Sequence, residues 1–123
     1  MTKILIVDDD EQITSLFASF LNSQGYEVTA LNKSSQALET ALLIKPDFFI
    51  LDLMMPDPDG FKLCQLLRTF PTFTYTPILI VTALSDEDSR IVAFGAGADD
   101  YLSKPFPINE LSKRVEDLIG KNK

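Results

Sequence analysis

The sequence predicts an α/β fold in which a five-stranded parallel sheet is covered by helices on both faces. Five short apolar runs recur along the 123 residues, and segments with helical periodicity separate them. Three of the runs are apolar without alternation, as expected for strands buried on both faces. Strands that alternate with helices at this spacing indicate right-handed crossovers between parallel neighbours. The chain therefore predicts a doubly wound (βα)5 domain.

The predicted strands all have the length of a single pass across a sheet. The first, third and fourth are the continuous apolar runs, the second is mixed and the fifth is weak. They are Ile4–Val7, Tyr26–Leu31, Phe48–Leu51, Ile78–Val81 and the pair Tyr101 and Leu102.

The predicted helices follow the strands one by one. The first is amphipathic and ends at Gly25, and the second ends before Lys45 because the residue before a proline avoids the α region. The fourth spans Glu87–Phe94 with Ser85 as its N-cap, and the fifth is capped by Asn109. The apolar positions of the first three helices are Ile13, Leu16, Phe17, Phe20 and Leu21; Ala37, Leu38, Ala41 and Leu42; and Phe61, Leu63, Cys64, Leu66 and Leu67. Those of the fifth are Leu111, Val115, Leu118 and Ile119.

The length leaves no room for a second domain beside five βα units. We therefore expect one domain over residues 1–120, with residues 121–123 as a tail or the start of a linker. The chain holds no apolar run long enough for a signal peptide or a membrane span. With its single cysteine, this predicts a cytoplasmic protein without an internal disulfide or a membrane attachment.

The charge and composition exclude several functions. The chain has 18 acidic and 11 basic residues, a net charge of −7, so direct binding to nucleic acid is not expected. Histidine is absent, which excludes Ser-His-Asp triads, histidine zinc sites and histidine acid-base catalysis. Any chemistry must come from carboxylates, hydroxyls and lysine.

Polar side chains follow four of the five apolar runs. Asp8 and Asp9 come after the first run, Asp52 after the third, Thr82 after the fourth and Lys104 after the fifth. In open doubly wound sheets, ligands bind beyond the carboxyl ends of the strands. We adopt the strand order 2-1-3-4-5 from flavodoxin-like folds, and in it the first and third strands are neighbours. Their acidic ends are then expected to meet.

Such crowding of carboxylates needs a counter-charge. Two like charges 4 Å apart repel by about 4 kcal/mol at an effective dielectric near 20. A Mg²⁺ ion held by carboxylate oxygens and water offsets the repulsion, and the Lys104 ammonium relieves it further. The cation also binds phosphoryl oxygens, which lets a carboxylate attack phosphorus and form an aspartyl phosphate.

Four motifs, taken together, resemble the receiver domain of bacterial two-component response regulators, the CheY-like family. Asp9 and Asp52 are 43 positions apart, Asp52 and Thr82 are 30 apart, and Thr82 and Lys104 are 22 apart, as in that family. The resemblance covers essentially the whole chain. The motifs are Ile6-Val7-Asp8-Asp9, Leu51-Asp52-Leu53-Met54-Met55-Pro56 followed by Asp59-Gly60, Val81-Thr82-Ala83, and Gly97-Ala98-Asp99-Asp100-Tyr101-Leu102-Ser103-Lys104-Pro105-Phe106.

The resemblance implies a role for each site residue. It makes Asp52 the phosphoacceptor, and Asp8, Asp9, Asp52 and the backbone carbonyl of Met54 the surroundings of Mg²⁺. It makes Thr82 and Lys104 the contacts of the phosphoryl group and Tyr101 the aromatic switch. It also implies a cis peptide bond between Lys104 and Pro105. The domain would then be a regulator rather than an enzyme, catalysing only its own phosphorylation and its slow dephosphorylation.

The implied partners are a sensor histidine kinase or phosphotransfer protein, and an output protein or linked effector domain. Receivers joined to winged-helix DNA-binding domains dimerise through charged pairs on the fourth helix, fifth strand and fifth helix. The residues that fit this pattern are Arg90, Asp99, Asp100, Glu110 and Arg114. Gly95 and Glu116 depart from it, so a phosphorylation-driven homodimer is a hypothesis at this stage.

Three other functions compete with this interpretation. A phosphatase of the haloacid dehalogenase type needs an acid two residues after its nucleophile, where this chain has Met54. A flavodoxin-like electron carrier needs a phosphate-binding loop after the first strand, where this chain has acids. A receiver that works without phosphorylation would be expected to lack some of the five key residues.

Asp8 to Glu11 also suit a helix N-terminus, a role that we assign to Asp10 and Glu11.

Overall fold

The computed structural model describes residues 1–121 and has the predicted alternation of strands and helices. The strands are β1 (Lys3–Val7), β2 (Glu27–Leu31), β3 (Phe48–Leu51), β4 (Ile78–Thr82) and β5 (Asp100–Ser103). The helices are α1 (Glu11–Ser23), α2 (Ala37–Ile44), α3 (Gly60–Arg68), α4 (Glu87–Gly95) and α5 (Ile108–Lys121), with short 3-10 helices η1 (Ser34–Gln36) and η2 (Pro71–Phe73). Within residues 1–121, no helix has the length and apolar character needed to cross a membrane.

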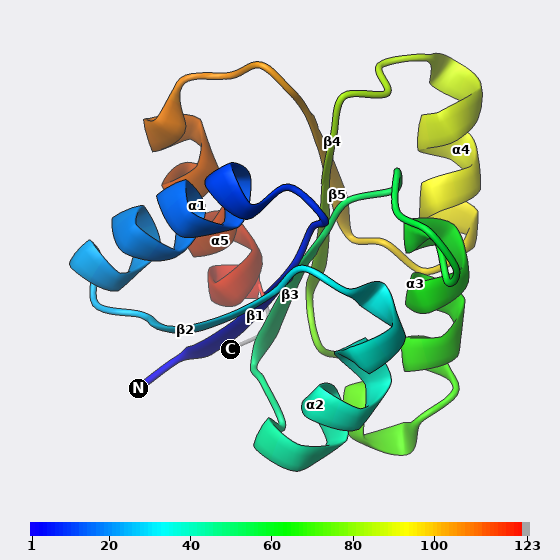
Figure 1. Cartoon of the computed structure of the whole chain (residues 1–123), viewed down its shortest axis with the longest axis horizontal. Coiled ribbons are helices and arrows are strands. Elements are labelled where there is room, and N and C mark those ends of the chain that lie inside the picture. The colour runs from blue at the N-terminus through cyan, green and yellow to red at the C-terminus, as the bar shows by residue number, and fades with distance from the viewer. Residues whose placement is uncertain (122–123) are drawn as a thin grey trace.

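The five strands form one parallel sheet in the order β2-β1-β3-β4-β5, which confirms the predicted topology. Helices α1 and α5 cover one face, and α2, α3 and α4 cover the other (Figure 1). Every residue of β3 and β4 is buried, which explains why their sequences are apolar without alternation.

The sheet separates two apolar cores. The core beneath α1 and α5 includes Phe17, Leu21, Leu111 and Val115, and the other includes Leu63, Leu67 and Phe73. Phe49 packs edge-on against Phe73, with ring centroids 5.2 Å apart. These layers hold the strands rigidly, so the loops after the strands start from fixed positions.

The N-terminal ends of α4 and α5 differ from the predicted caps, and α4 ends at Gly95, one residue later than predicted. Asp86, not Ser85, caps α4, because the Asp86 carboxylate accepts a hydrogen bond from Ser89 N at 3.0 Å. Asn109 lies inside the first turn of α5, which begins at Ile108. The N-cap of α1 is Asp10, whose carboxylate accepts from Gln12 N, and Gly25 follows that helix with φ 97°.

Two other details depart from the sequence pattern. Leu16 belongs to the apolar repeat of α1, yet it is 54% exposed, because the buried stripe of this helix is narrower than the repeat. Helix α5 continues to Lys121, one residue into the expected tail, and residues 122–123 lie outside the described part of the chain.

Candidate functional site

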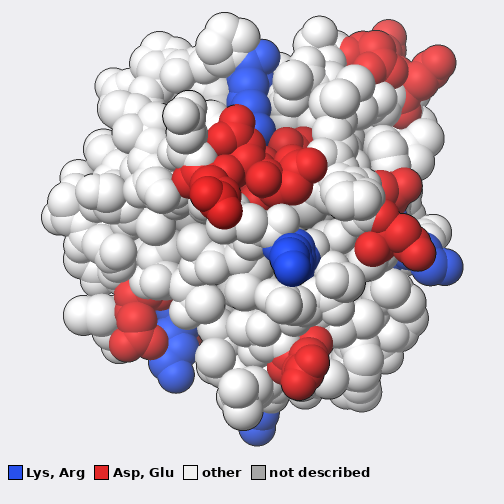
Figure 2. All heavy atoms as spheres, in the orientation of Figure 1, with Lys and Arg blue, Asp and Glu red and all other residues white. Residues whose placement is uncertain are grey.

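The acidic loops leave the sheet from two adjacent strands. Val7 of β1 lies beside Leu51 of β3, so the next residue of each loop, Asp8 or Asp52, emerges at the same edge. The backbone continues the sheet for one more step, because Asp52 N donates to Val7 O and Asp8 N donates to Leu31 O, both at 3.1 Å. Figure 2 shows acidic side chains gathered over the loop between β1 and α1.

Three carboxylates converge at this edge, as the sequence predicts. One oxygen from each of Asp8, Asp9 and Asp52 lies within 4.8 Å of the others. Asp8 and Asp52 are buried, 3% and 6% exposed, whereas Asp9 is exposed. An all-oxygen donor set of this size and charge fits a hard divalent cation, with open positions on the solvent side for water.

Lys104 supplies the counter-charge from the loop after β5. Its Nζ donates to Asp8 Oδ2 at 2.8 Å and to Asp52 Oδ2 at 3.1 Å. Burial raises the pKa of Asp8, and the bond from Lys104 opposes that rise only in part. Burial alone would lower the pKa of Lys104, but the two carboxylates outweigh it and the pKa is raised. The ammonium therefore stays charged between the two acids.

Thr82 and Tyr101 come together through the backbone of Leu84. Thr82 is fully buried, and its Oγ1 accepts from Leu84 N at 3.4 Å. The Tyr101 hydroxyl donates to Leu84 O at 2.6 Å, and the ring is buried beneath the Arg90 guanidinium, 5.1 Å from its centroid. Burial, and then the charge of Asp86, raises the pKa of Tyr101.

The loop after Asp52 is held close to helix α3. Met54 N donates to Asp52 Oδ1 at 3.1 Å, while the Met54 side chain is 53% exposed. A Cβ on Gly60 would overlap the carbonyl oxygen of Asp52 and lie 2.6 Å from Leu53 Cα. Only glycine lets the start of α3 approach the Asp52 backbone this closely.

The peptide bond between Lys104 and Pro105 is cis, as expected. The bond between Asp57 and Pro58 is also cis, which the sequence analysis did not anticipate.

Two polar residues at this edge were missed by the sequence analysis. Asn32 Nδ2 donates to the carbonyl of Asp8 at 2.9 Å, and Ser34 Oγ donates to the carbonyl of Pro56 at 2.7 Å. A signal was present, because Asn32 follows the second apolar run just as the acids follow the first and third. The residue type itself does not indicate this role, because an amide is neither a nucleophile nor a typical magnesium ligand.

The charged residues expected at a dimer interface pair within the chain. Arg114 contacts Asp100 and Glu110, each at 3.0 Å, and Asp99 contacts Arg68 at 2.8 Å. Arg90 lies over the rings of Tyr101 and Phe94.

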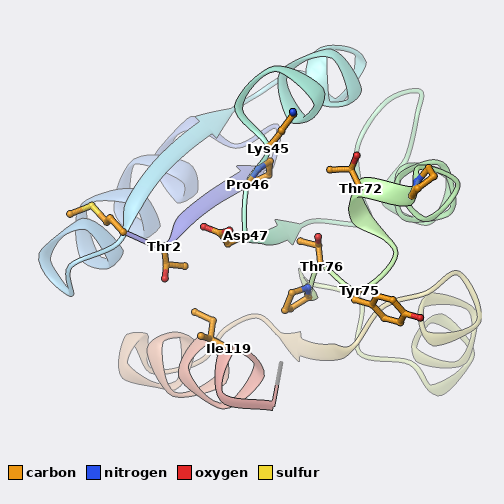
Figure 3. Close-up of a pocket in the computed structure, with 11 residues that line it drawn as sticks. Thr2, Lys45, Pro46, Asp47, Thr72, Tyr75, Thr76 and Ile119 are labelled. Carbon is orange, nitrogen blue, oxygen red and sulfur yellow. The ribbon is translucent and has the colours of Figure 1, made fainter. Parts of the chain in front are cut away.

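A hollow lies at the opposite, amino edge of the sheet (Figure 3). This groove of about 750 Å³ contains none of the residues predicted for the site. Its lining includes Lys45, Pro46, Asp47, Thr72, Tyr75 and Ile119.

With this geometry, the chain belongs to the response regulator receiver domain family, whose model matches residues 4–116. It is 40% identical over 119 residues to the DNA-binding dual master transcriptional regulator RpaA of Synechocystis, covering 97% of this chain and 49% of that protein. It is 38% identical over 120 residues to the alkaline phosphatase synthesis transcriptional regulatory protein PhoP of Bacillus subtilis, covering 98% of this chain and 49% of that protein. The chain thus spans about half the length of these curated relatives.

Solved structures of other response regulators have the same fold as this chain. A response regulator structure from Chloroflexus aurantiacus has a TM-score of 0.92 and 38% identity, covering 97% of this chain and 98% of its own. The chemotaxis protein CheY4 of Vibrio cholerae has a TM-score of 0.92 and 30% identity, covering 96% and 98%. The resemblance predicted from the four motifs is therefore confirmed.

Proposed function

We propose that this receiver domain is a magnesium-dependent phosphoacceptor that carries its phosphoryl group on Asp52. The observation that carries the proposal is the pair of buried carboxylates, Asp8 and Asp52, bridged by one ammonium at 2.8 and 3.1 Å. Buried like charges are costly unless they bind something. A phosphoryl group with a divalent cation satisfies all of these side chains at once.

In the proposed reaction an Asp52 oxygen attacks phosphorus of a phosphohistidine on a kinase or phosphotransfer protein. The new P–O bond forms as the P–N bond breaks, and the imidazole leaves with the bonding electron pair and takes up a proton. Asp8, Asp9, Asp52 and the Met54 carbonyl would hold Mg²⁺, which supplies charge neutralisation at the phosphoryl oxygens. Lys104, already beside Asp52, pairs with the added negative charge.

The phosphoryl group would then act on the region formed by α4, β5 and α5. Thr82 donates its hydroxyl to the phosphoryl oxygens. Leu84 N, which is bonded to the Thr82 hydroxyl, shifts with it, and Leu84 O is the acceptor of the Tyr101 hydroxyl. The orientation of Tyr101 thereby responds to the state of Asp52, and the α4-β5-α5 surface presents that state to an output partner or domain.

The curated relatives support a regulatory role in transcription. The names of RpaA and PhoP describe transcriptional regulators, and both proteins extend beyond the half that this chain matches. We propose that a sensor histidine kinase supplies the phosphoryl group and that an output protein or linked domain receives the signal. Binding of nucleic acid would belong to that output part, given the net charge of −7 here. A homodimer through α4, β5 and α5 would require Asp99, Asp100 and Arg114 to exchange their present partners.

We further infer slow self-dephosphorylation. Met54 and Leu84 flank the site with apolar side chains, which cannot orient an attacking water. Met54 is exposed, so its replacement by asparagine is compatible with the fold. Met54→Asn should shorten the lifetime of the aspartyl phosphate, measured by the decay of phosphorylated protein after the donor is removed. An unchanged decay rate would contradict this inference.

The proposed function is tested by mass spectrometry after treatment with acetyl phosphate and Mg²⁺. The wild type should gain one phosphoryl group, and Asp52→Asn should gain none. Omission of Mg²⁺ should abolish the modification. A covalent adduct that still forms on Asp52→Asn would reject Asp52 as the acceptor, and turnover of a phosphomonoester would favour the phosphatase alternative.

A further inference from the structure

We infer that the segment following β2 positions the acid site, although it contributes no carboxylate to it. Asn32 and Ser34 lie two residues apart, and each donates a hydrogen bond to one of the two acid-bearing loops. Asn32 reaches the carbonyl of Asp8 at 2.9 Å, in the loop after β1. Ser34 reaches the carbonyl of Pro56 at 2.7 Å, in the loop after β3. One short segment is therefore attached to both loops, and we call Asn32 and Ser34 the brace.

Asn32 also connects the loop to the helix that follows it. The same Nδ2 that binds the Asp8 carbonyl donates to Thr14 Oγ1 at 2.9 Å. Thr14 is 3% exposed, and its hydroxyl donates to the carbonyl of Glu11 at 3.1 Å. Asp9 lies between these two attachment points. The amide thus fixes both ends of the short stretch that presents Asp8 and Asp9.

Ser34 fixes the other loop from the same side. Its side chain is 4% exposed, and its hydrogen bond ends on a backbone carbonyl four residues after Asp52. A buried hydroxyl with a single carbonyl acceptor holds that carbonyl in place, because leaving either group unpaired is costly. Lys33, between the two brace residues, is exposed.

The brace binds the two loops at carbonyls beyond the last backbone hydrogen bonds of β1 and β3. The sheet-type backbone bonds that continue β1 and β3 reach Asp8 N and Asp52 N, at the start of the two loops. Mg²⁺ requires near-octahedral oxygen geometry, so small changes in the spacing of Asp8, Asp9 and Asp52 weaken binding. Side chains that orient ligands in this way typically change metal affinity by about 10- to 100-fold when removed. Asn32 and Ser34 are therefore positioning residues for the divalent cation.

This inference rests on the proposed function, and a calorimetric titration with Mg²⁺ alone tests it on the full chain. Asn32→Leu keeps the size of the side chain and removes its donors, and Ser34→Ala removes one hydroxyl. We expect the Kd for Mg²⁺ to be roughly tenfold higher in Asn32→Leu and roughly threefold higher in Ser34→Ala. Their matched controls, Asn22→Leu and Ser23→Ala, change the same side-chain types at exposed positions of α1 and should leave the Kd unchanged.

A second readout separates positioning from damage to the fold. The rate of phosphorylation by acetyl phosphate should need more Mg²⁺ in the brace variants and should return to within about twofold of wild type at saturation, because only the cation's affinity is lowered. A folding defect would instead lower the rate at every Mg²⁺ concentration. Thr14→Val removes the second acceptor of Asn32 together with the hydroxyl's bond to the Glu11 carbonyl, and should weaken Mg²⁺ binding less than Asn32→Leu does, whereas Thr14→Ser should retain wild-type affinity.

The Mg²⁺ affinities of the wild type, the brace variants and the controls decide between the brace and a general effect. Equal Mg²⁺ affinities in wild type, Asn32→Leu and Ser34→Ala overturn the brace and leave the proposed function intact. Weaker affinity in Asn22→Leu or Ser23→Ala to the same extent also overturns it, because the effect would then be general. A wild-type chain that binds no Mg²⁺ overturns the proposed function itself.

Discussion

Two basic side chains of equal exposure mark the opposite edges of the sheet. Lys104 at the carboxyl edge and Arg68 at the amino edge are each 18% exposed. Lys104 contacts two buried carboxylates, from the loops after β1 and β3. Arg68 contacts mainly neutral groups: its guanidinium donates to four backbone carbonyls at 2.6 to 3.4 Å and to a single, 42% exposed carboxylate. The carbonyls belong to Phe73, Thr74, Thr76 and Gly97.

The difference separates a structural cation from a functional one. Arginine has a rigid fork of donors, which ties the loops before β4 and β5 together in one geometry. Lysine is a point charge on a flexible stem, so it can exchange a carboxylate for a phosphoryl oxygen. The amino edge also has a hollow of about 750 Å³ (Figure 3), which holds none of the acids. Crowded buried charge, rather than the volume of a groove, distinguishes the candidate site in this fold.

The largest expected effect is at the amino edge. Arg68→Met removes all donors to the four carbonyls and should destabilise the chain by about 4 kcal/mol, since several buried acceptors lose their partners. Arg68→Lys should recover less than half of this, because an ammonium cannot match the fork. Urea unfolding measures both variants, and added Mg²⁺ should not narrow their deficit. A loss below about 1 kcal/mol for Arg68→Met would contradict the structural role.

At the carboxyl edge we expect a smaller loss of stability, which Mg²⁺ should partly restore. Lys104→Met leaves Asp8 and Asp52 side by side and should cost about 3 kcal/mol without divalent cations. Mg²⁺ supplies the missing counter-charge, so it should stabilise this variant more than the wild type and narrow the gap. Urea unfolding with and without Mg²⁺ measures the effect, with Lys33→Met as an exposed control near the same edge. A gap that Mg²⁺ leaves unchanged would mean that the cation binds elsewhere.

The two edges also differ in how far the sequence predicts them. The acids and Lys104 are predictable because each follows an apolar run, and parallel strands bring their carboxyl ends together. The strand order itself came from the fold class, and the structure agrees with it. Local patterns thus reach the functional edge whenever the strands are identified correctly.

The contacts of Arg68 were not predictable in the same way. Its partners are backbone carbonyls, and no residue type indicates which carbonyls face a given helix end. Asp99 illustrates the point, because the family pattern assigned it to an interface between chains, while the structure pairs it with Arg68 and Ile78 N. Similarly, Leu16 is 54% exposed although it continues the apolar repeat of α1, because helical periodicity alone does not specify how wide the buried stripe of a helix is.

The smallest effect concerns an ionisable group near Arg68. Burial raises the pKa of the Cys64 thiol from 9.0 to about 11, and the Arg68 charge lowers it only in part. The guanidinium of Arg68 is already bound to backbone carbonyls, whereas the Lys104 ammonium donates directly to two carboxylates. Below pH 9 the thiol is neutral in both the folded and the unfolded chain. Between pH 9 and 11 the unfolded chain loses its proton first, so the contribution of Cys64 to stability should fall by about 2 kcal/mol.

Urea unfolding of wild type and Cys64→Ala across this pH range, with reductant present, isolates the contribution from that of other groups. The stability of the wild type relative to the variant should be constant up to pH 9 and then decrease. A constant difference up to pH 11 would show that the thiol titrates equally in both states, and hence that the Arg68 charge fully offsets the burial of the thiol. Arg68 would then act on a neighbouring ionisable group through its charge, and not only through its bonds to carbonyls.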